Sequence, residues 1–376
     1  MGKVKLLGLK AGLAAMGGVY ALMKLAPVKK RYTFITKLQD TPTVDFEILQ
    51  EALRQKKPEH EIVNLCKPMD NLVAYVPHMF VQMWHLATSE AVFLDRSCLM
   101  VNGLTHRPTL KVVQLWHALG SMKKFGYAIL GTPEGESADL AEVCHMHRGY
   151  TDILISSRSF ERDYLEGFRC DPAVIREIPQ PRADVLANLE ERDVRRKRAR
   201  EWLGLAGSRK KVAVYAPTFR KDPGPHAQEA VQGLVDAIDL NRWEFVYAKH
   251  PVGGVDCEDP RIVQCLIPTF DALFAADVVV TDYSSVMYEA GLLDVPVLLY
   301  AYDWDSYQEK RTHNLDLQRE VPSVFTKDPQ EIAAVMDEYL DGDCEGYNHD
   351  AFRAFVARNV RMPESGTCCD AVIALL

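Results

Sequence analysis

VTDYSSVMYEAGLLDVPVLLY, residues 280–300, joins two apolar runs through a polar segment and a helical pattern. Apolar runs of strand length on both sides of a helix are typical of a βαβ unit, in which both strands lie parallel in one sheet. The polar segment, Thr281 to Ser285, comes just before the helix. Its simplest interpretation is capping, because Asp and Ser oxygens accept the free N–H groups of a first helical turn. A Ser-Ser pair at this place is also typical of an anion site.

The same alternation of short β-rich runs and longer helical patterns continues along most of the chain. Two series of predicted strands are separated by a charged helical pattern at residues 186–205. The predicted strands are residues 31–37, 60–66, 91–97, 111–117, 152–158 and 174–180, then 210–219, 243–250, 261–267, 277–282 and 296–302. Strands separated by helices indicate parallel sheets with right-handed crossovers. The sequence therefore predicts an α/β protein with two Rossmann-like domains that face a cleft.

Composition limits the class of protein. The chain has 376 residues, of which 48% are hydrophobic and 26% charged, as expected of a globular protein that forms a core. A net charge of −8 argues against nucleic acid as a partner, because such binding needs a basic face. The nine cysteines are odd in number and have no zinc-type spacing, which favours free thiols in a reducing compartment.

The N-terminal segment, residues 1–30, is mostly apolar with basic flanks. Lys10 and Lys24 limit its uninterrupted apolar run to 13 residues, 11–23, whereas about 20 are needed to span a bilayer. A soluble core helix and a signal peptide have similar patterns. The basic flanks favour a helix that lies on an anionic membrane surface. The remaining boundaries are expected at 31–190 and 205–340 for the two domains and 341–376 for C-terminal helices that pack back.

Polar motifs follow four of the predicted strands. In parallel sheets, ligands bind beyond the carboxyl ends of the strands. QLWHALGSMKKFG (114–126), YAPTFR (215–220), KHP (249–251) and TDYSS (281–285) all lie at such ends. Capping explains one of these motifs, but it explains the set of four poorly.

His117 is the candidate general base, because an imidazole with a pKa near 6.5 suits proton transfer at neutral pH. A structural histidine is the alternative. Lys123 and Lys124 follow it and attract phosphate, unless they form an ordinary solvated surface. Gly120 and Gly126 permit tight turns or close approach to a ligand.

His250 and Arg220 are candidates for binding an anion at the other strand ends, since Arg can hold phosphate with two parallel N–H groups. Arg311 follows the last strand, where a surface arginine is the alternative, and Arg182 is expected to have a structural role between domains. The sequence has no P-loop, no dinucleotide fingerprint and no metal-binding motif. We therefore expect a phosphate site that requires no cofactor or metal, although a divalent metal remains compatible with it.

These motifs, together with PQPRADVL and YQEKR, resemble the CDP-glycerol glycerophosphotransferase family of teichoic acid synthesis over residues 31–340. The resemblance implies a GT-B fold and peripheral (monotopic) attachment to the cytoplasmic face of the cell membrane. It implies transfer of glycerol phosphate from CDP-glycerol to a lipid-linked acceptor, with release of CMP. The short chain is similar to the priming enzymes, whose acceptor is an undecaprenyl-diphosphate-linked disaccharide.

The resemblance also implies roles for individual residues and domains. Residues 31–190 bind the acceptor and 205–340 the CDP-linked donor. His117 is the base for the acceptor hydroxyl, and His250 faces the donor diphosphate. The other expected donor-binding residues are Arg220, Thr281, Asp282, Ser284, Ser285 and Arg311, and those for acceptor or phosphate attraction are Trp116, Lys123 and Lys124.

Two departures from the family pattern leave the polyol and the acceptor open. Ala118 stands where the family usually has Gly, and Thr312 follows Arg311 where Gly is common. A CDP-ribitol-dependent transferase or a polyol-phosphate polymerase is therefore an alternative. Other classes are a GT-B glycosyltransferase that uses a nucleotide sugar, and a non-enzymatic membrane scaffold.

Overall fold

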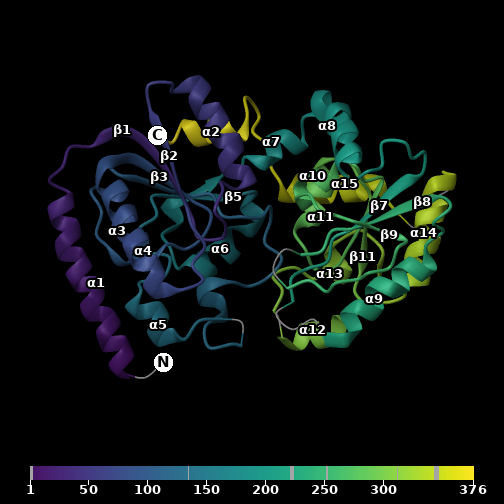
Figure 1. Ribbon diagram of the computed structural model, residues 1–376, viewed down its shortest axis with the longest axis horizontal. Coiled ribbons are helices and arrows are strands. Elements are labelled where there is room, and N and C mark those ends of the chain that lie inside the picture. Colours follow the sequence, from purple (N-terminus) through teal and green to yellow (C-terminus); the bar gives the residue numbers. More distant parts are fainter. Residues whose placement is uncertain (1–2, 134, 221–223, 251–252, 311, 343–346) are drawn as a thin grey trace. The chain divides into compact units, whose positions relative to one another are not determined.

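The computed structural model describes residues 3–133, 135–220, 224–250, 253–310, 312–342 and 347–376. The chain forms two compact units (Figure 1). The first comprises Met1–Ala118, Lys124–Asp184 and Arg361–Leu376, and the second Leu119–Lys123 and Val185–Val360. The N-terminal helix thus belongs to the first unit, and the C-terminal helices divide between both units.

The first unit is built on one six-stranded parallel sheet with the order β2-β1-β3-β4-β5-β6. Its strands are β1 (Lys29–Thr36), β2 (Glu61–Cys66), β3 (Ser89–Leu94), β4 (Lys111–Gln114), β5 (Asp152–Ile155) and β6 (Ile175–Glu177). Its helices are α1 (Lys3–Met23), α2 (Val44–Lys56), α3 (Leu72–Thr88), α4 (Leu99–Gly103), α5 (Ala138–Val143), α6 (Glu161–Phe168) and α16 (Cys368–Ile373). Helix α7 (Arg182–Leu186) lies at the boundary. Continuous apolar runs such as Val92–Leu94 are fully buried, as in a parallel sheet covered on both faces.

The second unit repeats this architecture with the strand order β12-β11-β10-β7-β8-β9, again all parallel. Its strands are β7 (Lys211–Tyr215), β8 (Trp243–Tyr247), β9 (Ile262–Gln264), β10 (Val278–Thr281), β11 (Val297–Tyr300) and β12 (Phe325–Thr326). Its helices are α8 (Leu189–Trp202), α9 (Gly224–Ala237), α10 (Thr269–Leu273), α11 (Val286–Leu292), α12 (Trp304–Lys310), α13 (Leu317–Glu320), α14 (Pro329–Asp341) and α15 (His349–Asn359). The two predicted series of strands are confirmed.

Helix α1 packs along α3 and α5 of the first unit (Figure 1). Tyr20 is 1% exposed and its hydroxyl lies 2.8 Å from Nδ1 of His106. Arg107 donates to the carbonyl of Ala26 at 2.6 Å, just beyond the helix end. By length and composition, Leu6–Met23 is apolar enough to cross a membrane, so the expectation that this helix is too short to span is not supported. One such helix near an N-terminus is weak evidence of a span.

Residues 119–123 leave the first unit and pack within the second. Gly120 has a φ of 73°, and a Cβ there would clash with the ring of Tyr288. Asn314 donates to the hydroxyl of Ser121 at 2.7 Å and to the carbonyl of Lys123 at 3.2 Å. The tight turn expected at Gly120 is therefore confirmed.

Candidate active site

The chain leaves β4 in an uncommon backbone conformation. Trp116 has a φ of 64°, in the left-handed region that bulky residues rarely adopt. Its N–H donates to Oε1 of Gln114 at 3.1 Å, and its ring packs against those of His117, Phe125 and Phe168, with centroids 4.3, 5.0 and 5.0 Å away. Such strain costs about 1–3 kcal/mol and persists where the surroundings enforce it, often at functional sites. This bend sets the position of His117.

The side chain of His117 is half-buried and its tautomer is fixed. Nδ1 lies 3.2 Å from the backbone carbonyl of Asp95. A carbonyl can only accept, so the proton is on Nδ1 and the lone pair is on Nε2. Burial, followed by the positive charge of Arg96, lowers the pKa of His117 to about 3. The imidazole is thus neutral at physiological pH, with Nε2 able to accept a proton.

Arg182 has the structural role that the sequence predicted, although within the first unit. It forms an ion pair with the buried Asp45, with Nη2 and Oδ2 2.5 Å apart. Its backbone N–H donates to the same carboxylate at 2.9 Å. This pair fixes α7 against α2.

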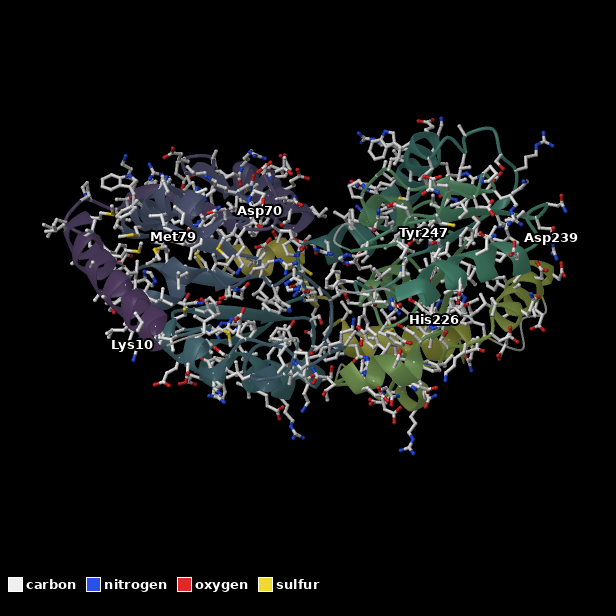
Figure 2. The ribbon with its side chains drawn as sticks, turned by 60° about the horizontal axis from the view of Figure 1, so that its bottom comes forward. Lys10, Asp70, Met79, His226, Asp239 and Tyr247 are labelled. Atoms are coloured by element: carbon white, nitrogen blue, oxygen red, sulfur yellow. The ribbon has the colours of Figure 1, made fainter. Side chains whose placement is uncertain are left out.

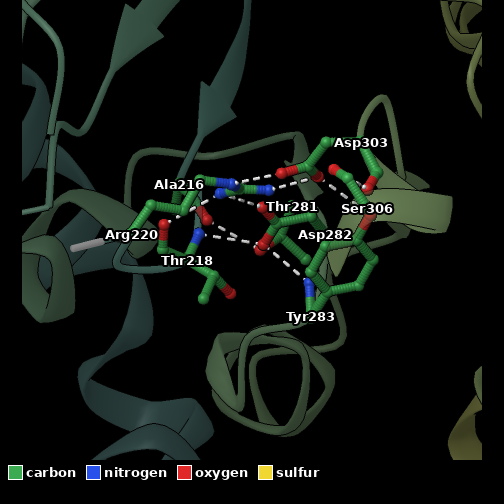
Figure 3. Close-up of polar contacts among 8 residues, drawn as sticks. All are labelled: Ala216, Thr218, Arg220, Thr281, Asp282, Tyr283, Asp303 and Ser306. Carbon is green, nitrogen blue, oxygen red and sulfur yellow. Dashed lines mark hydrogen bonds and ion pairs between the residues drawn. The ribbon is translucent and has the colours of Figure 1, made fainter. Parts of the chain in front are cut away.

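In the second unit, the polar segment after β10 ties strand ends together (Figure 3). Thr281 and Asp282 are both 0% exposed. The Thr281 hydroxyl donates to the carbonyl of Ala216 at 2.7 Å, and Oδ1 of Asp282 accepts from the N–H groups of Thr218 and Tyr283 at 2.9 and 2.6 Å. Neither side chain reaches the surface, and both tie strand ends together. The donor-binding roles of Thr281 and Asp282 stay predictions.

Arg220 completes this network (Figure 3). Its Nε and Nη2 donate to the two oxygens of Asp303, both at 2.7 Å, and Nη1 lies 2.8 Å from Oδ2 of Asp282. Nη1 also donates to the carbonyl of Thr218 at 3.0 Å. The two parallel N–H groups that were expected to hold phosphate are therefore taken by Asp303. Arg220 is buried between two carboxylates and anchors the strand ends, and its role in binding the donor stays a prediction.

The two serines differ in how they are used. The Ser284 hydroxyl accepts from the N–H of Val286 at 3.3 Å. Ser285 is the N-cap residue of α11, yet its side chain makes no capping hydrogen bond. Capping thus accounts for Ser284 but leaves the Ser285 hydroxyl unexplained, and both residues are half-buried. Their donor-binding role stays a prediction.

His250 lies after β8, half-buried, with its ring centroid 5.4 Å from that of Phe219. Together with Thr218 and Arg220 it lines a cavity of about 20 Å³, which has room for about one water molecule. Arg311 lies outside the described residues. The roles of His250 and Arg311 in binding the donor also stay predictions.

The two lysines of the same motif divide between the units. Lys123 belongs to the second unit, where its ammonium lies 5.3 Å from the centre of the Tyr307 ring, a cation–π distance. Lys124 belongs to the first unit and is half-buried. Attraction of phosphate by this pair stays a prediction.

The described residues contain no candidate metal site. Among the residues that the structure describes, no group of three or more His, Cys, Asp or Glu side chains is arranged to hold a metal ion.

Sequence reasoning missed two aspartates that the structure makes central. Asp303 follows β11 and binds Arg220, and Asp95 follows β3 and holds His117 through its carbonyl. Burial raises the pKa of Asp95 to about 6. Both residues end an apolar run, so their place at a strand end was the available signal.

The comparisons with known proteins agree with this architecture. The model of the CDP-glycerol:poly(glycerophosphate) glycerophosphotransferase family matches residues 19–367. The chain belongs to this family. One similar member is the teichoic acid ribitol-phosphate primase of Bacillus spizizenii. It is 29% identical over 83% of this chain and 84% of that protein. The teichoic acid glycerol-phosphate primase of Bacillus subtilis is 28% identical over 62% of this chain and 61% of that protein.

Longer family members are also similar. The teichoic acid poly(ribitol-phosphate) polymerase of B. spizizenii is 27% identical over 90% of this chain, which spans 55% of that polymerase. Solved structures of the wall teichoic acid polymerase TagF match 100% of this chain and 98% of theirs, with a TM-score of 0.76 at 17% identity. The likeness to TagF confirms the predicted GT-B type of α/β fold.

Proposed function

We propose that this glycerophosphotransferase-family protein transfers a polyol phosphate from a CDP-linked donor to a hydroxyl of a lipid-linked acceptor and releases CMP. CDP-glycerol is the first candidate donor. The proposed acceptor is an undecaprenyl-diphosphate-linked disaccharide, as for a priming enzyme. The observation that carries the proposal is the neutral imidazole of His117, whose Nδ1–H is held by the Asp95 carbonyl so that Nε2 is the proton acceptor.

In the proposed reaction, Nε2 of His117 takes the proton of the acceptor hydroxyl as its oxygen attacks the β-phosphorus of the donor. The new P–O bond forms a phosphodiester, and the bond from this phosphorus to the bridging oxygen breaks, so CMP leaves with its electron pair. Such a transfer depends on alignment and on neutralisation of phosphate charge more than on covalent help. Ser284, Ser285 and His250 are the proposed donors to the diphosphate.

The proposed location is the cytoplasmic face of the cell membrane, with peripheral attachment through α1. The outer side of this helix exposes the apolar side chains of Leu7 and Leu22, and Leu25 is exposed just beyond the helix end. On the neighbouring α3, Val73 and Trp84 are exposed as well. Lys10 lies on the same helix and Lys24 directly follows its end, and both favour anionic lipid.

CDP-ribitol is the second candidate donor. The ribitol-phosphate primase matches a larger share of this chain than the glycerol-phosphate primase does, 83% against 62%, at similar identity. This difference is the specific reason to test both donors side by side.

The test incubates the full chain with the lipid-linked disaccharide and either CDP-glycerol or CDP-ribitol, then measures CMP release and product mass. We expect CMP and a product heavier by one polyol phosphate with one of the donors. Addition of many units would instead identify a polymerase. Turnover only with a nucleotide sugar, releasing a nucleoside diphosphate, would overturn the proposal in favour of a glycosyltransferase, and no turnover with any donor would favour a scaffold.

A further inference from the structure

A cavity of about 250 Å³ lies within the first unit, lined from α1, α3, α4, α5 and the ends of β1 and β3. Most of its lining is apolar, for example Leu9, Ile35 and Leu99. Sulfur is abundant in the lining, from Met69, Met79, Met146, Cys98 and Cys144, and Figure 2 shows sulfur atoms around Met79. Methionine side chains are flexible and adapt to irregular apolar ligands. The lining is therefore suited to hydrocarbon.

Charged groups form another part of the lining: the cations of Lys37 and Arg96, and the carboxylates of Asp95 and Glu136. Across the described ranges, neither the Lys37 ammonium nor the Arg96 guanidinium makes an ion pair or a side-chain hydrogen bond, and Nε of Arg96 is buried without a partner. Asp95 is 2% exposed; its Oδ2 accepts from the Thr36 hydroxyl at 2.8 Å, whereas Oδ1 has no partner. Buried charges are normally paired, because an unpaired one is costly. Glu136 is exposed and bonds to neither Lys37 nor Arg96, so these two half-buried cations, without a bonded anion, indicate a site for an anionic group.

We propose that this cavity binds a phosphate-bearing lipid, with the phosphate at Lys37 and Arg96 and one hydrocarbon chain in the apolar part. An apolar cavity of about 150 Å³ holds benzene, so this one has room for about ten carbon atoms of a chain. The ligand would be the lipid part of the acceptor, and to that extent the inference rests on the proposed function.

The position of the cavity suits this ligand at both ends. Met69 and Leu72 line it and are exposed, 40% and 55%, so a chain can enter beside the exposed apolar side chains of α3. At the charged end, Asp95 lines the cavity while its backbone carbonyl holds His117. A phosphate bound at Lys37 and Arg96 would therefore direct the rest of the head group towards His117 of the same unit.

The first experiment titrates decyl phosphate into the full chain by calorimetry, below the concentration at which it forms micelles. Decanol, inorganic phosphate and dihexanoyl phosphatidylglycerol are titrated in parallel. We expect decyl phosphate to bind at least tenfold more tightly than each of the others, because only it combines one chain with a phosphate monoester. Equal affinity for inorganic phosphate, or for the two-chain lipid, would overturn the proposal.

The second experiment locates the binding. Lys37→Met combined with Arg96→Met removes the cations, and Ala141→Leu fills part of the cavity from α5. Each should weaken decyl phosphate binding at least tenfold. The matched controls, Lys197→Met on α8 and Ala138→Leu at an exposed position of α5, should leave it unchanged. Thermal unfolding checks that the variants fold.

Unchanged affinity for decyl phosphate in folded forms of both cavity variants would overturn the inference and leave the proposed transferase reaction intact. Conversely, absence of CMP release by a wild-type protein that binds decyl phosphate in this cavity would count against the proposed function and not against the lipid site.

Discussion

At the residue scale, His117 shows how burial both permits and limits base catalysis. Its low pKa keeps Nε2 unprotonated at neutral pH, yet a base with a pKa of about 3 has little driving force for proton transfer. A phosphate group bound nearby would raise that pKa, because a negative charge favours the imidazolium ion. The imidazole of His117 is thus a weak base in the free protein, and substrate binding would raise its pKa towards neutrality.

Replacement of His117 tests this role. We expect His117→Gln to lower kcat by about 10²–10⁴-fold, the usual contribution of a general base, while the protein stays folded. CMP release under saturating donor measures the effect. His145→Gln, at an exposed position in the same unit, is the matched control and should retain wild-type turnover. Equal turnover of the two variants would remove His117 from the mechanism.

The contacts of Arg220 predict a loss of stability when it is replaced. Arg220→Met leaves the buried carboxylate of Asp282 and the half-buried carboxylate of Asp303 without their cation, and breaking a buried ion pair typically costs about 3–5 kcal/mol. Urea unfolding measures the free energy. The control is Lys211→Met, which removes an exposed lysine from Asp277 while Arg196 stays paired with that carboxylate, and it should cost about 1 kcal/mol or less. Similar losses in the two variants would contradict the anchoring role.

These residues also show what the sequence could not reveal. Polar side chains at strand ends were correctly expected at Thr281, Asp282 and Arg220. Whether such a side chain binds a ligand or ties two strands together depends on its partner, and Asp303 is 83 residues away from Arg220 in the chain. The place of His117 shortly after β4 was predictable because its motif is local, whereas its role as a base stays a prediction. Its fixed tautomer was not predictable, since the Asp95 carbonyl comes from another strand end.

At the element scale, the predicted strands were confirmed, and most of them are shorter than expected. β4 stops at Gln114 rather than at residue 117, because the chain turns at Trp116 with a positive φ. β12, Phe325–Thr326, was missed because two residues are too few to show an alternating pattern. The charged helix expected at 186–205 is α8, Leu189–Trp202.

Helix α1 packs on the first unit with one side and exposes the other side, which is the proposed membrane-binding surface. Its buried side is fixed to the first unit by Tyr20, so deletion of residues 1–30 would also uncover His106 and disturb the unit. Substitutions on the exposed side are therefore the better test of membrane binding. Leu7 and Leu22 are 70% and 69% exposed, and each apolar side chain of this size contributes about 1.5–3 kcal/mol when it is buried.

We expect Leu7→Glu combined with Leu22→Glu to release the protein from anionic vesicles in a co-sedimentation assay. Two glutamates at exposed positions elsewhere in the first unit, Gln55→Glu and Ala138→Glu, match the change in charge. This control should still sediment with the vesicles at low salt. If both double variants sediment like the wild type, attachment does not involve the exposed side of α1.

At the scale of the whole molecule, two units with the same kind of sheet correspond to the two series of strands in the sequence. The family model and the TagF structures extend over nearly all of both units. The fold could be predicted because alternating strand and helix patterns have few parallel arrangements with right-handed crossovers. The two units nevertheless differ in their buried ionisable groups. The first contains neutral histidines, and the second contains the ion-pair network of Arg220.

The neutral histidines predict that acid destabilises the first unit. Burial lowers the pKa values of His85, His117 and His147 from 6.5 to about 4, 3 and 3. Because these groups take up protons more readily in the unfolded chain, their contribution is present above pH 6.5 and is lost as the pH falls. Asp95 has the opposite effect, since its raised pKa of about 6 favours the folded state on acidification. From pH 6.5 to 4.5, each histidine costs about 2 kcal/mol and Asp95 offsets about 2 kcal/mol.

The expected result is a net loss of about 4 kcal/mol in the free energy of unfolding of the first unit between pH 6.5 and 4.5. Urea unfolding at both pH values, followed by hydrogen exchange of the β4 and β5 amides, measures it in that unit. His147→Asn should reduce the loss by about 2 kcal/mol, because it removes one titrating group. Asn tolerates the φ of 61° at this position, so the variant should keep the fold. If the two proteins lose the same free energy on acidification, His147 is not a source of the pH dependence, and equal stability of the wild type at both pH values would contradict the whole account of neutral histidines.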